Sequence, residues 1–556
     1  MESGRFLLAV VLMIAVVVIT NILIPPVEPV DVPATGPDPG APPVPSATTP
    51  PPPARDPVPA AGQTEPEDTR GPEQIVTVES DVVRFGFSNR GAALVSAELL
   101  QYESFSPDLE GRPVQLQPDV GRGLIRHRVR LDDQVIDLDT LAFETRATTV
   151  SVTPGGGPET FEMTWSQPDG GLGITITYTV APDNYVFDVS GRVTGTGTTP
   201  QLLIDMGPTL RSNEVEPRED QASLTYVINS LQTGIASTAL DNIEREQIDE
   251  GPLRWVAIKN KYFVVAAMES ADRPTPFGGV IARPNAEPYS ADLTATLLGD
   301  DTGAFGYRLY VGPQQADRLA AIGNQLQDVS VFGWRFLQPV LRPLGHAITW
   351  ALLQMHRALD IGYGWVLILF GFLIRFVLWP LNAKAMRSQL KNMEMQPRIK
   401  EIQARHKGDP QKLQQEMLKL YKEEGFNPMG GCLPMLLPLP VLITLFFVFQ
   451  ATIEFRGVPF LWLPDLSLKD PLYILPVALG VSMFIQQWLN MKSTKDAPVQ
   501  MKYMTYIMPV VLTVLFVNFA SGLNLYYASM NIASVPQQLQ IMREKKKRAA
   551  VLEKKV

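Results

Sequence analysis

Long apolar runs dominate the C-terminal third of the chain and constrain its fold more than any other feature. An α-helix needs about 20 mostly apolar residues to cross the hydrocarbon core of a bilayer. The final run, 503–542, would be about 60 Å long as one helix, about twice the thickness of that core. It must therefore fold back, and Ala520-Ser521-Gly522 offers the turn. Five helical spans are predicted here, at 361–381, 430–451, 472–489, 503–520 and 522–542.

The N-terminus has a further apolar run, at residues 6–24. Arg5 precedes the run, and Pro25-Pro26 follows it without a small-x-small cleavage site, which is the mark of a cleaved signal peptide. Residues 1–24 are therefore predicted to be an uncleaved signal anchor with its N-terminus in the cytoplasm. Residues 25–72 are rich in Pro, Ala, Gly and Thr. Such a segment cannot bury enough apolar surface to fold, and it is predicted to be a disordered linker.

Residues 73–328 alternate apolar and polar side chains in short stretches such as FEMTWSQ and GITITYTVA. Turn signals such as PGGGP and QPDGG separate these stretches. The pattern is typical of a large all-β sandwich. Residues 329–360 then mix Trp, Phe and Leu with Arg and His, interrupted by Pro339 and Pro343. This segment is predicted to lie amphipathically in the membrane interface; the alternative is the last helix of a soluble domain.

The basic residues are strongly segregated, although the net charge is −9. They gather in 382–425, 491–502 and 543–556, while the loop around 453–470 lacks such a cluster. With the N-terminus inside, six crossings place every basic segment in the cytoplasm and the β-domain outside, as the positive-inside rule requires. The predicted fold class is thus a six-span α-helical membrane protein with a five-helix core, a large external all-β sandwich and a basic cytoplasmic tail at 543–556.

The insert at 382–425 carries an apolar stripe on each side of the breaker Gly408-Asp409-Pro410. This arrangement predicts a helical hairpin in the cytoplasm. Its basic outer face could meet anionic lipid, ribosomal RNA or a nascent chain, or it could simply be solvated, and charge alone does not choose. The stripes comprise Ile399 and Ile402 in the first arm and Leu413, Met417 and Leu420 in the second.

Residues suited to metal binding or catalysis are sparse. Cys432 is the single cysteine, and the four histidines are scattered without ligand spacing. No P-loop motif occurs. Ser521-Gly522 superficially resembles a serine-protease motif, but no histidine lies in the core of any predicted span. The sequence therefore predicts no catalytic residue, no metal and no cofactor, and it disfavours an intramembrane protease.

Arg375 lies inside the apolar run FGFLIRFVLWPL. A central Arg costs about 2.5–3.5 kcal/mol on membrane-insertion scales, so such residues usually face a water-filled cavity or a partner. No Asp or Glu lies beside it in the spans, which offer neutral polar residues instead. A solvated positive site that opens to the cytoplasm and attracts a transient negative group is one interpretation. The alternative is that Arg375 snorkels to the interface, since Leu381 is only about 9 Å further along a helix.

Two other function classes remain compatible with polar residues inside a bundle. A solute transporter lines a cavity in this way, but it usually shows internal repeats with broken helices, and the five spans after the sandwich have no matching halves. The other class is a device that handles a polypeptide guest.

Three ordered stretches carry a family resemblance: FLIRFVLWPLNAKAM, QPRIKEIQARHKGDPQKLQQEMLKLYKEEGFNPMGGCLP and SGLNLYYASMN. They closely resemble the YidC family of membrane protein insertases, and SNRGAALVSAELLQYE near residue 88 resembles the start of that family's periplasmic β-domain. The resemblance implies a protein of the bacterial inner membrane that is not an enzyme. It implies that the chain inserts and helps fold membrane proteins, alone or with the Sec translocon, without hydrolysing ATP. The implied partners are nascent membrane proteins, the Sec translocon, membrane lipids and the ribosome, the last through the hairpin and the basic tail, but not specific DNA.

The resemblance also assigns residues. Arg375 matches the arginine of a hydrophilic groove that opens to the cytoplasm and to lipid and accepts a guest's polar, often acidic, tail. Tyr527 matches a substrate-facing tyrosine of the last span. Gly371 and Pro438 stand where relatives have Thr and Gln, and are expected to remove polar groups from the groove wall. The guest-contacting strip of the third span is matched by Leu439, Pro440 and Leu442, and Thr444 and Asn531 complete the expected lining. The alternatives are a polytopic solute transporter and a Sec-associated scaffold.

Overall fold

The computed structural model separates the described residues into two compact units, one within residues 394–427 and the other comprising residues 70–393 and 428–556. The predicted signal anchor 1–24 and all but the last residue of the predicted linker 25–72 lie outside the described residues. So do Cys432 and Pro438. The structure describes residues 72–118, 123–168, 170–182, 184–330, 337–380, 398–399, 401–402, 404–406, 409–423, 439–492 and 499–553.

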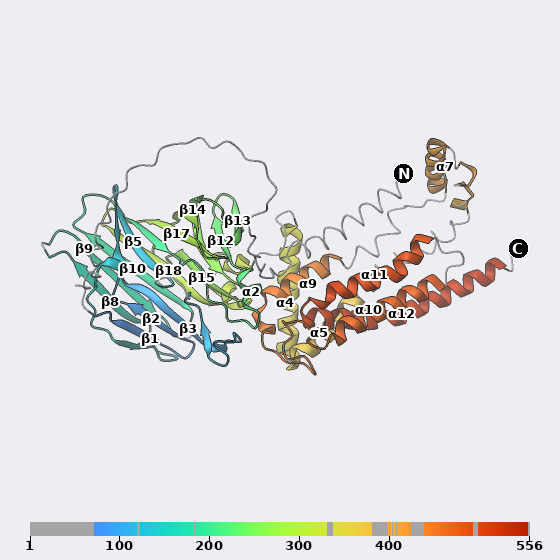
Figure 1. The fold of residues 1–556 in the computed structure, drawn as a ribbon, viewed down its shortest axis with the longest axis horizontal. Coiled ribbons are helices and arrows are strands. Elements are labelled where there is room, and N and C mark those ends of the chain that lie inside the picture. Colours follow the sequence, from blue (N-terminus) through green and yellow to red (C-terminus); the bar gives the residue numbers. More distant parts are fainter. Residues whose placement is uncertain are drawn as a thin grey trace, which may run out of the picture. The chain divides into compact units, whose positions relative to one another are not determined.

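The β-domain contains two sheets (Figure 1). The smaller has the order β4-β3-β2-β1-β7, and its β1–β7 pair is parallel. The larger has 13 strands in the order β6-β5-β11-β17-β16-β14-β15-β18-β10-β9-β8, with β12 and β13 joined at β14. The strands of the smaller sheet are β1 (Ile75–Glu79), β2 (Val83–Ser88), β3 (Ala93–Glu103), β4 (Pro113–Gln115) and β7 (Thr149–Ser151). Those of the larger sheet are β5 (Arg126–Leu131), β6 (Gln134–Asp137), β8 (Glu159–Ser166), β9 (Gly173–Val180), β10 (Val186–Thr194), β11 (Gln201–Asp205), β12 (Thr225–Ser230), β13 (Gly234–Ala239), β14 (Gln247–Lys259), β15 (Phe263–Glu269), β16 (Phe277–Pro284), β17 (Ala291–Leu298) and β18 (Ala304–Pro313).

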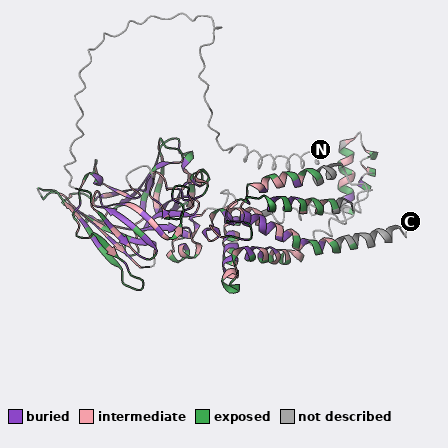
Figure 2. Ribbon diagram, turned by 60° about the horizontal axis from the view of Figure 1, so that its bottom comes forward, coloured by how far each residue is buried: buried purple, intermediate pink, exposed green. Residues whose placement is uncertain are grey.

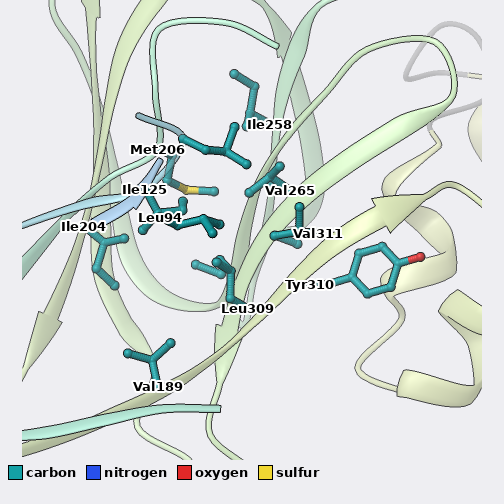
Figure 3. Packing of buried hydrophobic residues seen from close by; sticks show 14 of the residues in the cluster. Leu94, Ile125, Val189, Ile204, Met206, Ile258, Val265, Leu309, Tyr310 and Val311 are labelled. Carbon is teal, nitrogen blue, oxygen red and sulfur yellow. The ribbon is translucent and has the colours of Figure 1, made fainter. Parts of the chain in front are cut away.

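The alternation seen in the sequence becomes the two faces of these strands (Figure 2). In β9, GITITYTV, every second side chain from Ile174 to Val180 is buried, because successive side chains of a strand point to opposite faces. The buried faces form one apolar cluster. Figure 3 shows Leu94 of β3 close to Ile125 and Met206, with Val311 of β18 facing the same space. The prediction of a large all-β domain in this part of the chain is confirmed.

The helical region follows the β-domain in the chain. Among the described residues, no helix by itself combines the length and apolar composition of a membrane crossing. Helices α4 and α5 meet that test only as a pair, and they are bent by 118° where they join. The helices are α4 (Gln338–Leu359), α5 (Tyr363–Val377), α9 (Leu439–Ala451), α10 (Ile474–Lys492), α11 (Val499–Val517) and α12 (Ser521–Glu553).

Helix α4 corrects one expectation. Pro339 and Pro343 were expected to interrupt segment 329–360, but α4 runs continuously through Pro343. Pro339 lies in the first turn, where backbone N–H groups have no partner inside the helix. The N–H that Pro343 lacks would have bonded to the carbonyl of residue 339, so only a bond near the helix start is lost.

Helices α5 and α12 approach each other closely at Gly371. A Cβ atom added at Gly371 of α5 would lie 3.0 Å from the carbonyl oxygen of Tyr526 and 3.2 Å from the Met530 nitrogen in α12. Gly371 is therefore buried against the backbone of α12. The loss of a polar group from a groove wall remains a prediction for Gly371; the structure adds that its small size lets α5 and α12 touch.

The unit within residues 394–427 contains α7 (Pro410–Glu423). Ile399 and Leu420 are both buried, with Ile402 and Met417 packed against them. Asp409 accepts a hydrogen bond from the backbone N–H of Lys412 at 3.1 Å, near the start of α7. Side chains from the two predicted apolar stripes therefore pack on each other.

Candidate functional site

Arg375 lies in the last turn of α5 and reaches across to α12. Its Nη2 donates to Oε1 of Gln537 at 2.6 Å. The Gln537 residue is only 3% exposed. The contact is possible because Gly371, one turn earlier on α5, brings the two helices together.

Gln537 is a partner that sequence reasoning missed. A helical spacing signal for it exists, since Tyr526, Met530 and Gln537 follow one another at intervals of four and seven residues and so share one face of α12. Gly371 contacts Tyr526 and Met530 on that same face. This spacing indicates that Gln537 points toward α5. The partner of Arg375 is a neutral amide and not a carboxylate.

The Arg375–Gln537 pair keeps spare hydrogen-bond donors. Nε of Arg375 and Nε2 of Gln537 are buried, and neither has a partner in the described part of the chain. Buried donors normally find an acceptor, and no described carboxylate forms an ion pair with Arg375. The site can therefore accept an oxygen from outside the described residues, such as a water, a carbonyl or a carboxylate.

A second polar cluster joins α10 and α12. Nδ2 of Asn531 donates to Oγ of Ser482 at 3.2 Å, and Nε2 of Gln486 donates to Oγ of Ser534 at 3.3 Å. Asn531 is six residues before Gln537, which places the two on different sides of α12. The structure thus engages Asn531 with α10 and does not bring it to Arg375.

Tyr527 packs against α11 rather than against the Arg375–Gln537 pair. Its ring lies 5.2 Å from that of Phe516 in α11, and the residue is 9% exposed. In this conformation the expected guest-facing tyrosine is packed between helices.

The strip expected on α9 is partly accessible. Pro440 is exposed and Leu442 is half-buried, whereas the side chain of Leu439 lies outside what the structure describes. Thr444 is fully buried, and its hydroxyl donates to the carbonyl oxygen of Pro440 at 2.7 Å. Thr444 therefore satisfies its own helix and does not offer its hydroxyl to the Arg375 site.

Helices α9 and α12 touch close to the start of α12. A Cβ atom at Gly522 would lie 2.4 Å from the ring of Phe449, near the end of α9. Gln537 is fifteen residues further along α12, about 22 Å at 1.5 Å per residue. The tight contact between these two helices thus lies well away from the Arg375–Gln537 pair.

The described ranges contain no group of three or more His, Cys, Asp or Glu side chains that could hold a metal ion.

Comparison with known proteins identifies the family. Residues 75–344 match the model of the YidC periplasmic domain, and residues 354–548 match that of the 60Kd inner membrane protein. A membrane protein insertase YidC of Chlorobaculum parvum is 32% identical over 496 residues, which cover 85% of this chain and 82% of the relative. The chain belongs to the YidC family of membrane protein insertases. The insertase YidC of Cupriavidus metallidurans is 33% identical over 487 residues, covering 84% of this chain and 83% of that one.

Among solved structures, a crystal structure described as an active YidC insertase with the first transmembrane domain resolved is 18% identical. It covers 84% of this chain and 94% of that chain, with a TM-score of 0.33.

YidC membership confirms the resemblance drawn from the sequence motifs. The chain is an inner-membrane protein with a periplasmic domain, and that domain is the β-domain described above. It is a membrane protein insertase and not an enzyme, and its substrates are nascent membrane proteins.

Proposed function

We propose that this insertase receives guest proteins in a hydrophilic groove beside α5, α9 and α12, with Arg375 as its positive site. The observation that carries the proposal is the Arg375–Gln537 pair, which holds a guanidinium at a helix–helix contact with buried donors left open. An acidic or carbonyl-rich guest tail supplies the missing acceptors.

The contact between α9 and α12 supports a groove with one closed end. The helices meet tightly at Phe449 and Gly522, far along α12 from Gln537. Phe449 lies near the end of α9. The loop that follows α9 carries Arg456, which contacts the periplasmic domain. This favours closure on the periplasmic side and access to Arg375 from the cytoplasm.

The proposed topology has six crossings with both termini in the cytoplasm. The basic residues of 382–425, 491–502 and 543–556 support it through the positive-inside rule. The break between α11 and α12 falls at residues 518–520, beside the turn that the length of the last apolar run requires. The proposed spans are 1–24, 361–381, 430–451, 472–489, 503–520 and 522–542.

The driving force needs no nucleotide. Arg375 attracts a negative tail more strongly as the local dielectric constant falls, which offsets part of the cost of bringing that tail toward the membrane. The guest's apolar segment then passes along Pro440 and Leu442 into lipid. Removing apolar surface from water contributes about 25 cal/mol per Å², so this last step makes insertion favourable.

The proposed partners follow from the charged segments. The basic hairpin 382–425 and the basic tail 543–556 would engage the ribosome and anionic lipids. Larger guests would be handed over from the Sec translocon. Specific DNA is not among the proposed partners. Family membership selects a polypeptide-handling protein over a solute transporter.

A crosslinking experiment tests the groove. A photo-crosslinkable residue at Leu442 is compared with one at Ile532, an exposed position on α12 directed away from the site. A short, acidic-tailed, single-span protein is then translated onto the membranes. Crosslinks from Leu442 to the guest's apolar segment, and few from Ile532, are expected. Equal crosslinking from both positions would contradict a defined guest path.

A further inference from the structure

Arg456 lies just beyond the end of α9, and its side chain inserts into the periplasmic domain. It follows α9 and the short turn η5 (Ile453–Phe455), and its side chain is 3% exposed. Nε donates to Oε1 of Glu214 at 2.8 Å. Nη1 donates to the carbonyl oxygen of Glu103 at 2.8 Å, and Nη2 donates to that of Asn213 at 3.0 Å. Every nitrogen of the guanidinium therefore has a partner on the β-domain.

Aromatic rings enclose the same guanidinium. Its central carbon lies 4.3 Å from the ring centroid of Phe105 and 5.5 Å from that of Phe263. A cation over an aromatic face within about 6 Å is attracted by the ring quadrupole, more so when water is excluded. The planar fork of Arg suits this combination of stacking and several hydrogen bonds, which the Lys ammonium does not match.

The residues beside Arg456 are fitted to the same surface. Ile453 is buried in the main apolar cluster of the β-domain. Gly457 has φ +71°, and a Cβ atom there would lie 2.7 Å from the Phe105 ring, so both the backbone conformation and the space call for glycine. Ile453, Arg456 and Gly457 are thus packed against the β-domain, although they closely follow α9.

A second ion pair lies nearby and is exposed. Nζ of Lys469 is 2.5 Å from Oε1 of Glu216. Exposed pairs contribute little to stability, whereas removing one partner of a buried pair is strongly destabilising because a charge is left unpaired. Glu214 is in the second situation, and burial raises its pKa to about 7 despite the nearby Arg456 guanidinium. The Arg456–Glu214 pair is therefore expected to matter more for the stability of this junction than the Lys469–Glu216 pair.

The geometry points to a role for the periplasmic domain: through Arg456, Glu214 and Phe105, it holds the periplasmic end of α9 in place. We call these residues, with Glu103 and Asn213, the Arg456 lock. Because Pro440 and Leu442 lie on α9, the lock also sets the position of the proposed guest strip. That consequence rests on the proposed groove, whereas the docking itself does not.

Distance measurements on the full-length protein in lipid nanodiscs test the docking. Spin labels are placed at Leu298 of β17 and at Leu461 in the loop after α9, both exposed, in a Cys432→Ser background. The lock predicts a narrow distance distribution that broadens severalfold in Arg456→Met and less in Arg456→Lys. Arg273→Met is the matched control, because Arg273 forms an exposed ion pair with Asp300 elsewhere on the β-domain. A distribution that Arg456→Met leaves as narrow as the control would overturn the lock.

A measurement without substitution covers the case in which Arg456→Met fails to fold. In the wild-type protein, the backbone amides of 455–458 are expected to exchange hydrogen as slowly as those at the ends of neighbouring β-strands. Exchange as fast as that of an exposed loop would overturn the docking.

Insertion assays on the same variants separate the two parts of the proposal. Arg456→Met is expected to insert guests more slowly than Arg273→Met. Broadened distances with unchanged insertion would retain the docking and overturn its link to α9, whatever crosslinking at Leu442 shows for the groove.

Discussion

Arg375 and Gln537 lie 162 positions apart in the chain and are joined by a 2.6 Å hydrogen bond between α5 and α12. The bond pairs a charged donor with a neutral acceptor, so the positive charge is held in place without being cancelled. A carboxylate in place of Gln537 would neutralise the guanidinium. The proposed groove depends on a positive charge that is not neutralised.

Gln537→Glu should therefore impair insertion selectively. The new carboxylate would form an ion pair with Arg375 and compete with an acidic guest tail. We expect insertion of an acidic-tailed guest to fall about tenfold, equivalent to about 1.4 kcal/mol, with a smaller loss for a neutral tail. Protease protection of the guest in proteoliposomes measures this. Gln538→Glu is the control, since Gln538 bonds to Ser534 on a different side of α12; an equal loss in both variants would argue against the selective role of Gln537.

Gly371→Val should loosen the contact between α5 and α12. A Cβ atom at this position already meets the backbone of α12 at 3.0–3.2 Å, and forcing extra atoms into a packed interface costs about 1–3 kcal/mol. The unfolding temperature in detergent is expected to drop. Leu373→Val, at an exposed position two residues on, should change it little. A Gly371→Val protein as stable as Leu373→Val would mean that the helices do not pack this closely.

Glu454 predicts a pH dependence at the periplasmic junction. It lies beyond the end of α9, and its Oε2 is buried without a hydrogen-bond partner among the residues described. Burial raises the pKa of Glu454 to about 7, with Asp317 adding to the rise and Arg357 opposing it. The folded protein thus holds a proton that the unfolded chain releases near its ordinary pKa of about 4.3. The stability linked to this proton is fully present below that value and is lost as the pH rises through about 7.

The unfolding temperature should accordingly fall between about pH 4.3 and about pH 7. Glu454→Gln should flatten part of this fall; Glu214, whose pKa is also about 7, accounts for a further part. Glu401→Gln, at an exposed position on a separate unit, should leave the profile unchanged. A profile that Glu454→Gln does not alter would show that Glu454 ionises freely in the folded protein.

Local patterns in the sequence predicted the local structure well. The period of two in GITITYTV became the alternating faces of β9, and the stripes containing Ile399 and Leu420 pack on each other. These features depend on neighbours within a few residues, which a single sequence displays directly. The interruption expected at Pro343 was wrong, because a proline near a helix start removes only a bond that the surrounding packing can replace.

Contacts between distant segments were not predictable in this way. Arg456 meets Glu214 across 242 positions, and nothing in the periodicity of either segment signals the other. The same holds for Gln537, and for Tyr527, whose packing on Phe516 depends on how α11 and α12 meet. Such pairs are decided by tertiary packing, so the sequence predicted that Arg375 needs a cavity or partner but not which side chain would hold it.

The most direct test of the account varies the charge at residue 375 and in the guest together. Wild type, Arg375→Lys and Arg375→Ala are reconstituted, and each is supplied with two single-span guests that differ only in an acidic or a neutral tail. If Arg375 attracts the tail, Arg375→Lys retains more insertion of the acidic guest than Arg375→Ala, and the difference shrinks for the neutral guest. Equal insertion of the acidic guest by all three proteins would contradict the charge-attraction mechanism.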